Sequence, residues 1–186
     1  MTTRTTSLTD SYRRSDAPLS RVTGSLSAAD WEAASPCEGW TARDVVAHMI
    51  DAQRDFLTGH DVVLGDRPDV DADPARAWAE HRDAVLVVLA DDDVTGTAFD
   101  GHFGPTTVGE TLDRFYVFDM VAHRWDIARA AGREESFTVE ELDRLETAIE
   151  GFGPAIHAEG ICKPGVEAPE DADRQTRVLA SLGRRP

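Results

Sequence analysis

The sequence predicts an all-α protein, an antiparallel four-helix bundle with extra short helices and a long loop. Three observations predict this fold class. Apolar residues recur at helical spacing in several long segments, and helix-start signals precede two of these segments. No series of alternating apolar and polar residues indicates a set of strands. At 186 residues the chain fits one core, so we expect a single metal-binding domain over residues 1–186.

The first two predicted helices lie in the N-terminal third of the chain. The apolar spacing predicts a helix over residues 8–31, but Pro18 lies inside it and is expected to kink or split it. A turn rich in Pro and Gly follows. Thr41 with Asp44 then forms a capping box, which predicts the start of a second helix over residues 42–57.

The middle of the chain contains the strongest helical pattern. A third helix is predicted over residues 75–90, after a polar connector rich in Asp and Pro. Residues 91–107 break the pattern and are expected to form a long loop with a short strand pair. The strongest helix is predicted over residues 108–132, and Gly132 is placed to cap its C-terminal end.

The last part of the chain carries two further helical patterns. Thr138 and Glu141 form a second capping box, which predicts a helix over residues 138–152. A shorter helical stretch is expected over residues 174–182. These two segments are expected to be additions outside the predicted four-helix bundle.

Composition argues against several classes of function. A formal net charge of −16 argues against nucleic acid, because phosphate binding needs a basic surface, and against anionic membranes. No apolar run approaches the roughly 20 residues that span a bilayer, and no apolar secretory signal is visible. Two cysteines are too few for a disulfide framework. We therefore expect a cytoplasmic protein with neither a membrane nor a nucleic acid as its partner.

The helix predicted over residues 108–132 carries two potential metal ligands. Asp119 and His123 lie four residues apart, so their side chains project from the same face, about one turn from each other. That face also carries most of the apolar residues and should point into the bundle. A buried carboxylate is costly unless it is paired, and a divalent metal can satisfy both a carboxylate and an imidazole.

His48 is the natural third ligand, because it flanks the apolar stripe of its own helix. Two histidines and one carboxylate leave coordination positions open, which is typical of catalytic zinc sites and of non-haem iron. Two simpler interpretations stay open. Asp119 and His123 can form a hydrogen-bonded pair that holds two helices together. His48 can be a core histidine that bonds a backbone carbonyl.

Other polar residues have weaker claims to a place at this site. Asp126 is either an acceptor for a ligand imidazole or a solvent-facing partner of Arg129 or Arg133. His102 lies in a Gly-rich loop that could fold over the site. Cys37 is assigned as a buried structural thiol. The remaining histidines follow no ligand spacing and are expected at the surface or in loops: His60, His81 and His157.

Three stretches of the sequence resemble a known family. Residues 35–48 (SPCEGWTARDVVAH), residues 118–128 (FDMVAHRWDIA) and the closing LGRRP are similar to signatures of actinobacterial mycothiol-dependent maleylpyruvate isomerase-like metal-binding proteins. The similarity covers nearly the whole chain, and the closing LGRRP also matches a short single-domain subgroup. These proteins belong to the wider DinB-like superfamily of four-helix bundles.

The resemblance implies a divalent metal held by His48, Asp119 and His123, usually zinc, with nickel and iron as alternatives. It also implies mycothiol as a cosubstrate, which the metal would activate. A metal-bound thiol is deprotonated near neutral pH and so becomes a nucleophile. The expected activity is transfer or isomerisation on a small electrophile. Homodimers are common in this superfamily, so a homodimer is expected as well.

Two departures from the isomerase narrow this expectation. The isomerase carries Glu where this chain has Asp119, which is one methylene shorter and can shift the metal. The isomerase also has an additional C-terminal domain, for which this chain has no room, so maleylpyruvate isomerisation is not expected. No general base is evident from the sequence. A non-catalytic metal-binding or stress-response module, a metal-dependent hydrolase and a purely structural bundle remain alternatives.

Overall fold

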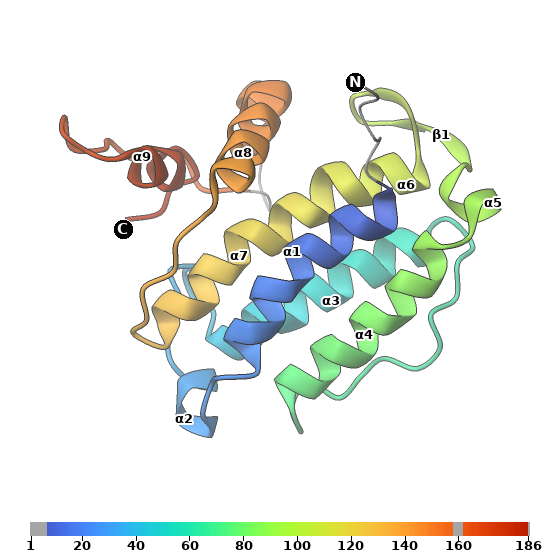
Figure 1. Ribbon diagram of the computed structural model, residues 1–186, viewed down its shortest axis with the longest axis horizontal. Coiled ribbons are helices and arrows are strands. Elements are labelled where there is room, and N and C mark those ends of the chain that lie inside the picture. Colours follow the sequence, from blue (N-terminus) through green and yellow to red (C-terminus); the bar gives the residue numbers. More distant parts are fainter. Residues whose placement is uncertain (1–6, 158–161, 186) are drawn as a thin grey trace, which may run out of the picture.

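The computed structural model describes residues 7–157 and 162–185, and most of these residues are helical (Figure 1). Within them, the sheet is one antiparallel pair, β1 (Ala98–Gly101) and β2 (Gly104–Thr107). The all-α class and the short strand pair expected in the long loop are therefore confirmed. No helix in these residues is long and apolar enough to cross a membrane.

Four long helices surround the main core and lie side by side (Figure 1). Helix α1 contacts α4 and α7, and α3 contacts the same two helices. Met49, Trp78 and Met120 fill the space between them and are buried. The bounds of these helices are α1 (Leu8–Thr23), α3 (Ala42–Thr58), α4 (Pro74–Leu89) and α7 (Val117–Ala130).

The predicted helix boundaries rest on local hydrogen bonds that the structure contains. The Thr41 hydroxyl accepts the Asp44 N–H and the Asp44 carboxylate accepts the Thr41 N–H, and a second box of this kind starts α8 (Val139–Phe152). Gly132 has a φ of 66°, and the next residue donates its N–H to the Ala128 carbonyl. This is a Schellman end, and only glycine adopts that φ without strain.

The first predicted helix is wrong in one respect, because its break does not fall at Pro18. Helix α1 runs through Pro18 to Thr23, and a separate short helix, α2 (Ala28–Trp31), follows after Gly24. Leu19, directly after the proline, and Tyr12, about a turn and a half before it, are both buried, and this packing holds the helix together across the missing N–H.

The strongest predicted helix is interrupted by a π-helical segment. Its start is α6 (Val108–Thr111), its middle is the π-helical η1 (Leu112–Tyr116), and its end is α7. A π-turn adds one residue and rotates everything after it by about 100° relative to a continuous α-helix. Asp119 and His123 both lie after this turn, so their shared face is unaffected.

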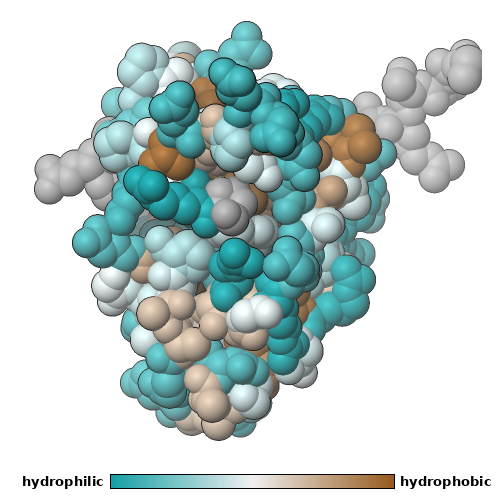
Figure 2. All heavy atoms as spheres, turned by 90° about the vertical axis from the view of Figure 1, so that its left-hand side faces the viewer, coloured by the Kyte–Doolittle hydropathy of each residue, from teal (hydrophilic) through white to brown (hydrophobic). Residues whose placement is uncertain are grey.

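A second layer covers the outer side of α7. Helix α8, the 3₁₀ segment η2 (Gly153–His157) and α9 (Arg174–Ser181) enclose a second apolar core with Phe118, Trp125 and Leu145. Helix α7 is therefore buried on almost every side, between the two cores. Figure 2 views the molecule from the side of α9, and hydrophilic residues predominate on that face, as the net charge of −16 suggests.

Candidate metal centre

The three predicted ligands meet at one point between α3 and α7. One donor atom from each of His48, Asp119 and His123 lies within 4.8 Å of the other two. The His48 Nε2 atom is 3.8 Å from Asp119 Oδ2, and the two imidazole rings are nearly perpendicular, at 81°. The structure thus brings together three residues that are 71 and 4 positions apart in the sequence.

The cluster is open on one side. The His48 and Asp119 side chains are each 31% exposed, whereas the His123 side chain is 9% exposed. The Trp40 ring lies 4.8 Å from the His48 ring and limits its movement. A bound group can therefore reach the donors of His48 and Asp119 from the surface.

Asp126 orients His123 from behind. Its Oδ2 accepts a hydrogen bond from His123 Nδ1 at 2.9 Å, and both carboxylate oxygens accept bonds from Arg184, at 3.0 and 2.6 Å. With Nδ1 occupied, Nε2 is the nitrogen of His123 that remains for a ligand. Carboxylate–histidine pairs of this kind accompany most metal-binding histidines. Of the two roles considered for Asp126, the structure contains the first, and Arg129 and Arg133 pair with other carboxylates.

Both carboxylates of the centre are ionised at neutral pH. Burial alone would raise the pKa of Asp126, but the Arg184 charge and the bonds from His123 and Arg184 lower it to about 2. Burial likewise opposes ionisation of Asp119, but the nearby His48 and His123 rings hold its pKa below the usual value. Negative charge at this point suits a divalent cation.

Cys37 forms a second group of donors with His123 and Asp126. Its Sγ lies 3.4 Å from Asp126 Oδ2, and burial together with that carboxylate raises the pKa of the thiol to about 12. The thiol therefore stays protonated at neutral pH. Since Arg184 occupies both oxygens of Asp126, this second group is a hydrogen-bonded cluster. Cys37 was expected to be buried, but it is only half-buried.

Two pockets adjoin the three donors. The outer pocket has a volume of about 400 Å³, and Trp40, His157 and Lys163 contribute to its wall. The aromatic pocket has a volume of about 210 Å³ and is named for four phenylalanines in its wall: Phe103, Phe115, Phe118 and Phe152. Four residues line both pockets: His48, His123, Cys162 and Arg184. The candidate centre thus lies where the two pockets meet.

The sequence matches the profile of the mycothiol maleylpyruvate isomerase N-terminal domain over residues 12–128, which is more than half of the chain. The chain belongs to this family. Comparison with curated proteins gave no match, and comparison with solved structures gave none. The family match includes His48, Asp119, His123 and Asp126 but ends before α8 and Arg184. In this member of the family, Arg184 joins the centre from outside the matched segment.

Arg184 is the residue that the sequence argument missed. It lies 58 positions after Asp126 and near the end of the chain, so no local pattern connects the two. A signal was nevertheless present. Asp126 lies in a largely apolar stretch of a helix that is buried on almost every side, and a buried carboxylate requires a cation or a metal.

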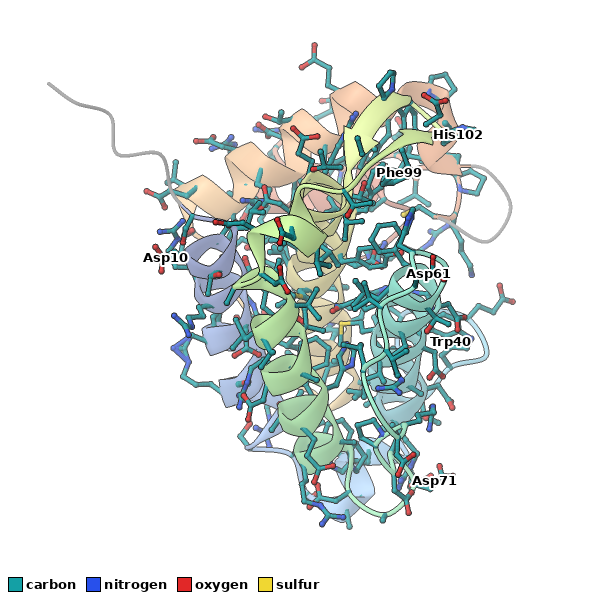
Figure 3. The ribbon with its side chains drawn as sticks, turned by 90° about the vertical axis from the view of Figure 1, so that its right-hand side faces the viewer. Asp10, Trp40, Asp61, Asp71, Phe99 and His102 are labelled. Atoms are coloured by element: carbon teal, nitrogen blue, oxygen red, sulfur yellow. The ribbon has the colours of Figure 1, made fainter. Side chains whose placement is uncertain are left out.

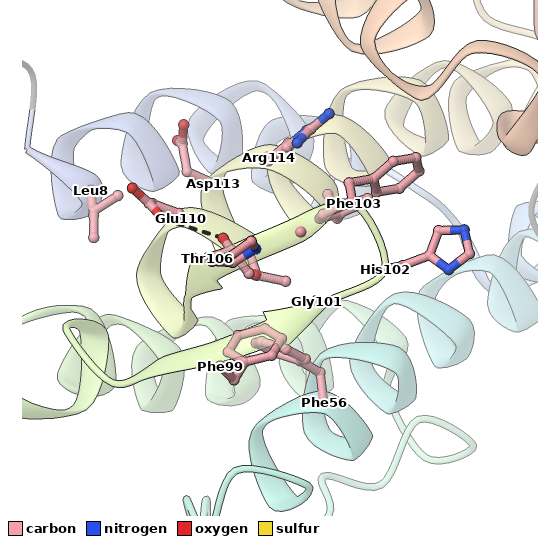
Figure 4. A pocket seen from close by; sticks show the side chains of 14 residues that line it. Leu8, Phe56, Phe99, Gly101, His102, Phe103, Thr106, Glu110, Asp113 and Arg114 are labelled. Atoms are coloured by element: carbon pink, nitrogen blue, oxygen red, sulfur yellow. Dashed lines mark hydrogen bonds between the residues drawn. The ribbon is translucent and has the colours of Figure 1, made fainter.

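Two of the other histidines differ from expectation. His81 was expected at the surface, yet it is buried on α4, where its Nε2 bonds Gln53. Its spacing of four from both Ala77 and Val85, which are buried, could have shown this. His102, at the tip of the β1–β2 hairpin, lines a separate pocket beneath the hairpin (Figures 3 and 4). The neighbouring Phe103 is the hairpin residue that reaches the candidate centre.

Proposed function

We propose that this chain is a divalent-metal-dependent enzyme of the thiol-transferase or isomerase type, which uses mycothiol as its cosubstrate and acts on a small electrophile. His48, Asp119 and His123 hold the metal, with zinc as the first candidate and nickel and iron as alternatives. The observation that carries the proposal is the convergence of these three donors at the junction of two pockets. The proposal includes a DinB-like arrangement of α1, α3, α4 and α7.

The residues present fit a zinc-type ion. Imidazole nitrogen and carboxylate oxygen are common zinc ligands at about 2.0–2.2 Å, which places two ligands roughly 3.3–3.5 Å apart. The 3.8 Å between His48 Nε2 and Asp119 Oδ2 is close to this separation. Asp126 fixes the ring of His123, as a ligand-orienting carboxylate does.

An open site supports an enzyme over a non-catalytic metal-binding module. Such a module should close its coordination sphere with a further protein ligand and should lack an adjoining pocket. Within residues 7–157 and 162–185, no fourth donor joins the group of three, and two pockets adjoin it. His123 bonds Asp126, which also argues against a structural pair of Asp119 with His123.

A bound divalent cation would lower the pKa of a coordinated thiol or water. The chain's own residues prepare that site. Arg184 and Asp126 hold His123 in one orientation, and the protonated Cys37 does not compete as a nucleophile. The outer pocket is the larger of the two, and Trp40 and the ion pair of Lys163 with Glu38 in its wall suit a polar cosubstrate. The aromatic pocket shields the reacting atoms from water.

The first test is metal content, measured by elemental mass spectrometry on tag-free protein after reconstitution. About one ion per chain is expected in the wild type, and loss of that ion in His123→Ala. His60→Ala serves as the matched control, because His60 packs against Phe56 and Phe99, outside the group of donors. Absence of metal from the wild type, even after reconstitution, would contradict the proposal.

The second test addresses the reaction. The metal-loaded protein should consume a simple electrophile only when mycothiol is present, and the rate should fall to background in His123→Ala. A metal-dependent hydrolase would use the same three ligands but would turn over an ester without the thiol. Omitting mycothiol therefore separates the two reactions. Sedimentation analysis of the same preparation tests the expected homodimer.

A further inference from the structure

The wall of the aromatic pocket is assembled from four separate parts of the fold. Phe103 comes from the β1–β2 hairpin, Phe115 from η1, Phe118 from α7 and Phe152 from α8. The Phe115 and Phe152 rings are stacked, 4.9 Å apart and 12° from parallel, and Phe118 meets Phe152 edge-on at 84°. Ordered aromatic faces of this kind favour a flat apolar ligand.

The charges around the pocket argue against an acidic ligand. Among the described residues of its wall, the charged groups are Asp119 and Arg184, apart from the histidines. Arg184 already donates to both oxygens of Asp126, so it offers no free charge to a ligand. In the metal-free protein, a carboxylate placed here would lose its water without gaining a partner and would lie near Asp119. An uncharged ligand avoids both penalties.

The size of the pocket limits the ligand to one ring. A cavity of about 150 Å³ lined by apolar side chains is known to take benzene. At about 210 Å³ the aromatic pocket has room for a single ring with short substituents. The three proposed metal ligands, His48, Asp119 and His123, line the same pocket.

We propose that the aromatic pocket binds a small, uncharged aromatic molecule, and that this molecule is the electrophilic substrate of the centre. The role as substrate rests on the proposed function, whereas binding of the ring does not require a metal.

Phe103 is the residue that sets access and specificity in this scheme. It is 41% exposed at the hairpin turn, and it lines both the aromatic pocket and the hairpin pocket of about 570 Å³ (Figure 4). Its ring therefore lies between the two spaces. The guanidinium of Arg114 lies 5.2 Å from the ring centres of both Phe103 and Phe152 and stabilises the closed wall.

The test measures binding of nitrobenzene, an uncharged single ring, by titration calorimetry to metal-loaded and metal-free protein. Maleate, a dianion of comparable size, is the comparison ligand for the metal-free protein, where no ion can bind its carboxylates. Ala155→Phe places a ring in the pocket from η2 without touching a donor, and should weaken nitrobenzene binding at least tenfold. Val87→Phe, at an exposed position of α4, is the matched control and should bind as the wild type does.

A second variant keeps the test valid if Ala155→Phe does not fold. Phe103→Ala removes an exposed ring from the pocket wall, which should lower nitrobenzene affinity several-fold. Nitrobenzene binding that is lost in the pocket variants supports the inference. No binding, binding unchanged in Ala155→Phe and Phe103→Ala, or equal binding of maleate to the metal-free protein overturns it.

Different results would overturn the proposed metal centre and the proposed aromatic ligand. A protein that holds its metal but does not bind nitrobenzene overturns the aromatic substrate and leaves the metal centre. A protein that binds nitrobenzene in this pocket but takes up no metal supports the pocket and overturns the proposed function.

Discussion

Removal of Arg184 should destabilise the whole domain, although it is the third residue from the C-terminal end. Its guanidinium donates two bonds to Asp126, whose side chain is 0% exposed. Arg184→Ala leaves that carboxylate buried beside only the His123 imidazole and the Cys37 thiol. A buried charge that loses its partner is among the costliest defects in a folded protein.

The size of the effect follows from two estimates. Lowering the pKa of Asp126 from 3.8 to about 2 corresponds to about 2 kcal/mol, at 1.36 kcal/mol per unit. Breaking a buried ion pair by removing one partner typically costs about 3–5 kcal/mol. Since His123 and Cys37 still bond Asp126, we expect a loss of about 3 kcal/mol at pH 7.

The loss should depend on pH in a defined direction. A carboxylate with a lowered folded pKa contributes stability above its unfolded pKa, and this contribution disappears as the pH falls through the folded pKa of about 2. In Arg184→Ala burial raises the pKa of Asp126, so the group can take up a proton and relieve the strain. The difference in stability between wild type and variant should therefore shrink as the pH falls toward about 4.

Urea unfolding at pH 7 and pH 4 measures both effects. Arg185→Ala is the matched control, because the next residue is also an arginine and is exposed. It should change the free energy of unfolding by less than about 0.5 kcal/mol. If Arg184→Ala is as stable as Arg185→Ala at pH 7, the C-terminal segment does not hold Asp126 in solution and the reasoning is refuted.

Three further predictions concern the centre and the helices around it. Asp126→Asn should lower metal affinity by about 10–100-fold, measured by competition with a zinc indicator, because His123 loses its charged partner; unchanged affinity would contradict that role. Gly132→Ala should cost about 1–2 kcal/mol in urea unfolding, because φ is 66° there, and a neutral effect would refute the Schellman end. Burial and then Arg54 lower the pKa of His81 from 6.5 to about 3, so below pH 6.5 the unfolded chain binds a proton that the folded chain does not. The wild type should thus lose about 2 kcal/mol more than His81→Gln between pH 7 and pH 5, and parallel losses would exclude this cause.

The sequence by itself determined the features that depend on neighbouring residues. The capping boxes at Thr41 and Thr138 and the glycine end at Gly132 are set by contacts within a few positions, and all three occur in the structure. Asp119 and His123 share a face because they are one helical turn apart. The structure brings His48 to them, as its place beside the apolar stripe of its helix suggested.

Only the tertiary structure decided the features that join distant segments. The pairing of Arg184 with Asp126 spans 58 positions, and the aromatic pocket needs one phenylalanine from each of four elements. Helical periodicity reports which face of a helix is apolar, but not which segment covers it. The second layer of α8 and α9 covers the outer face of α7, and for that reason Asp126 became a buried, paired carboxylate behind the candidate metal ligand.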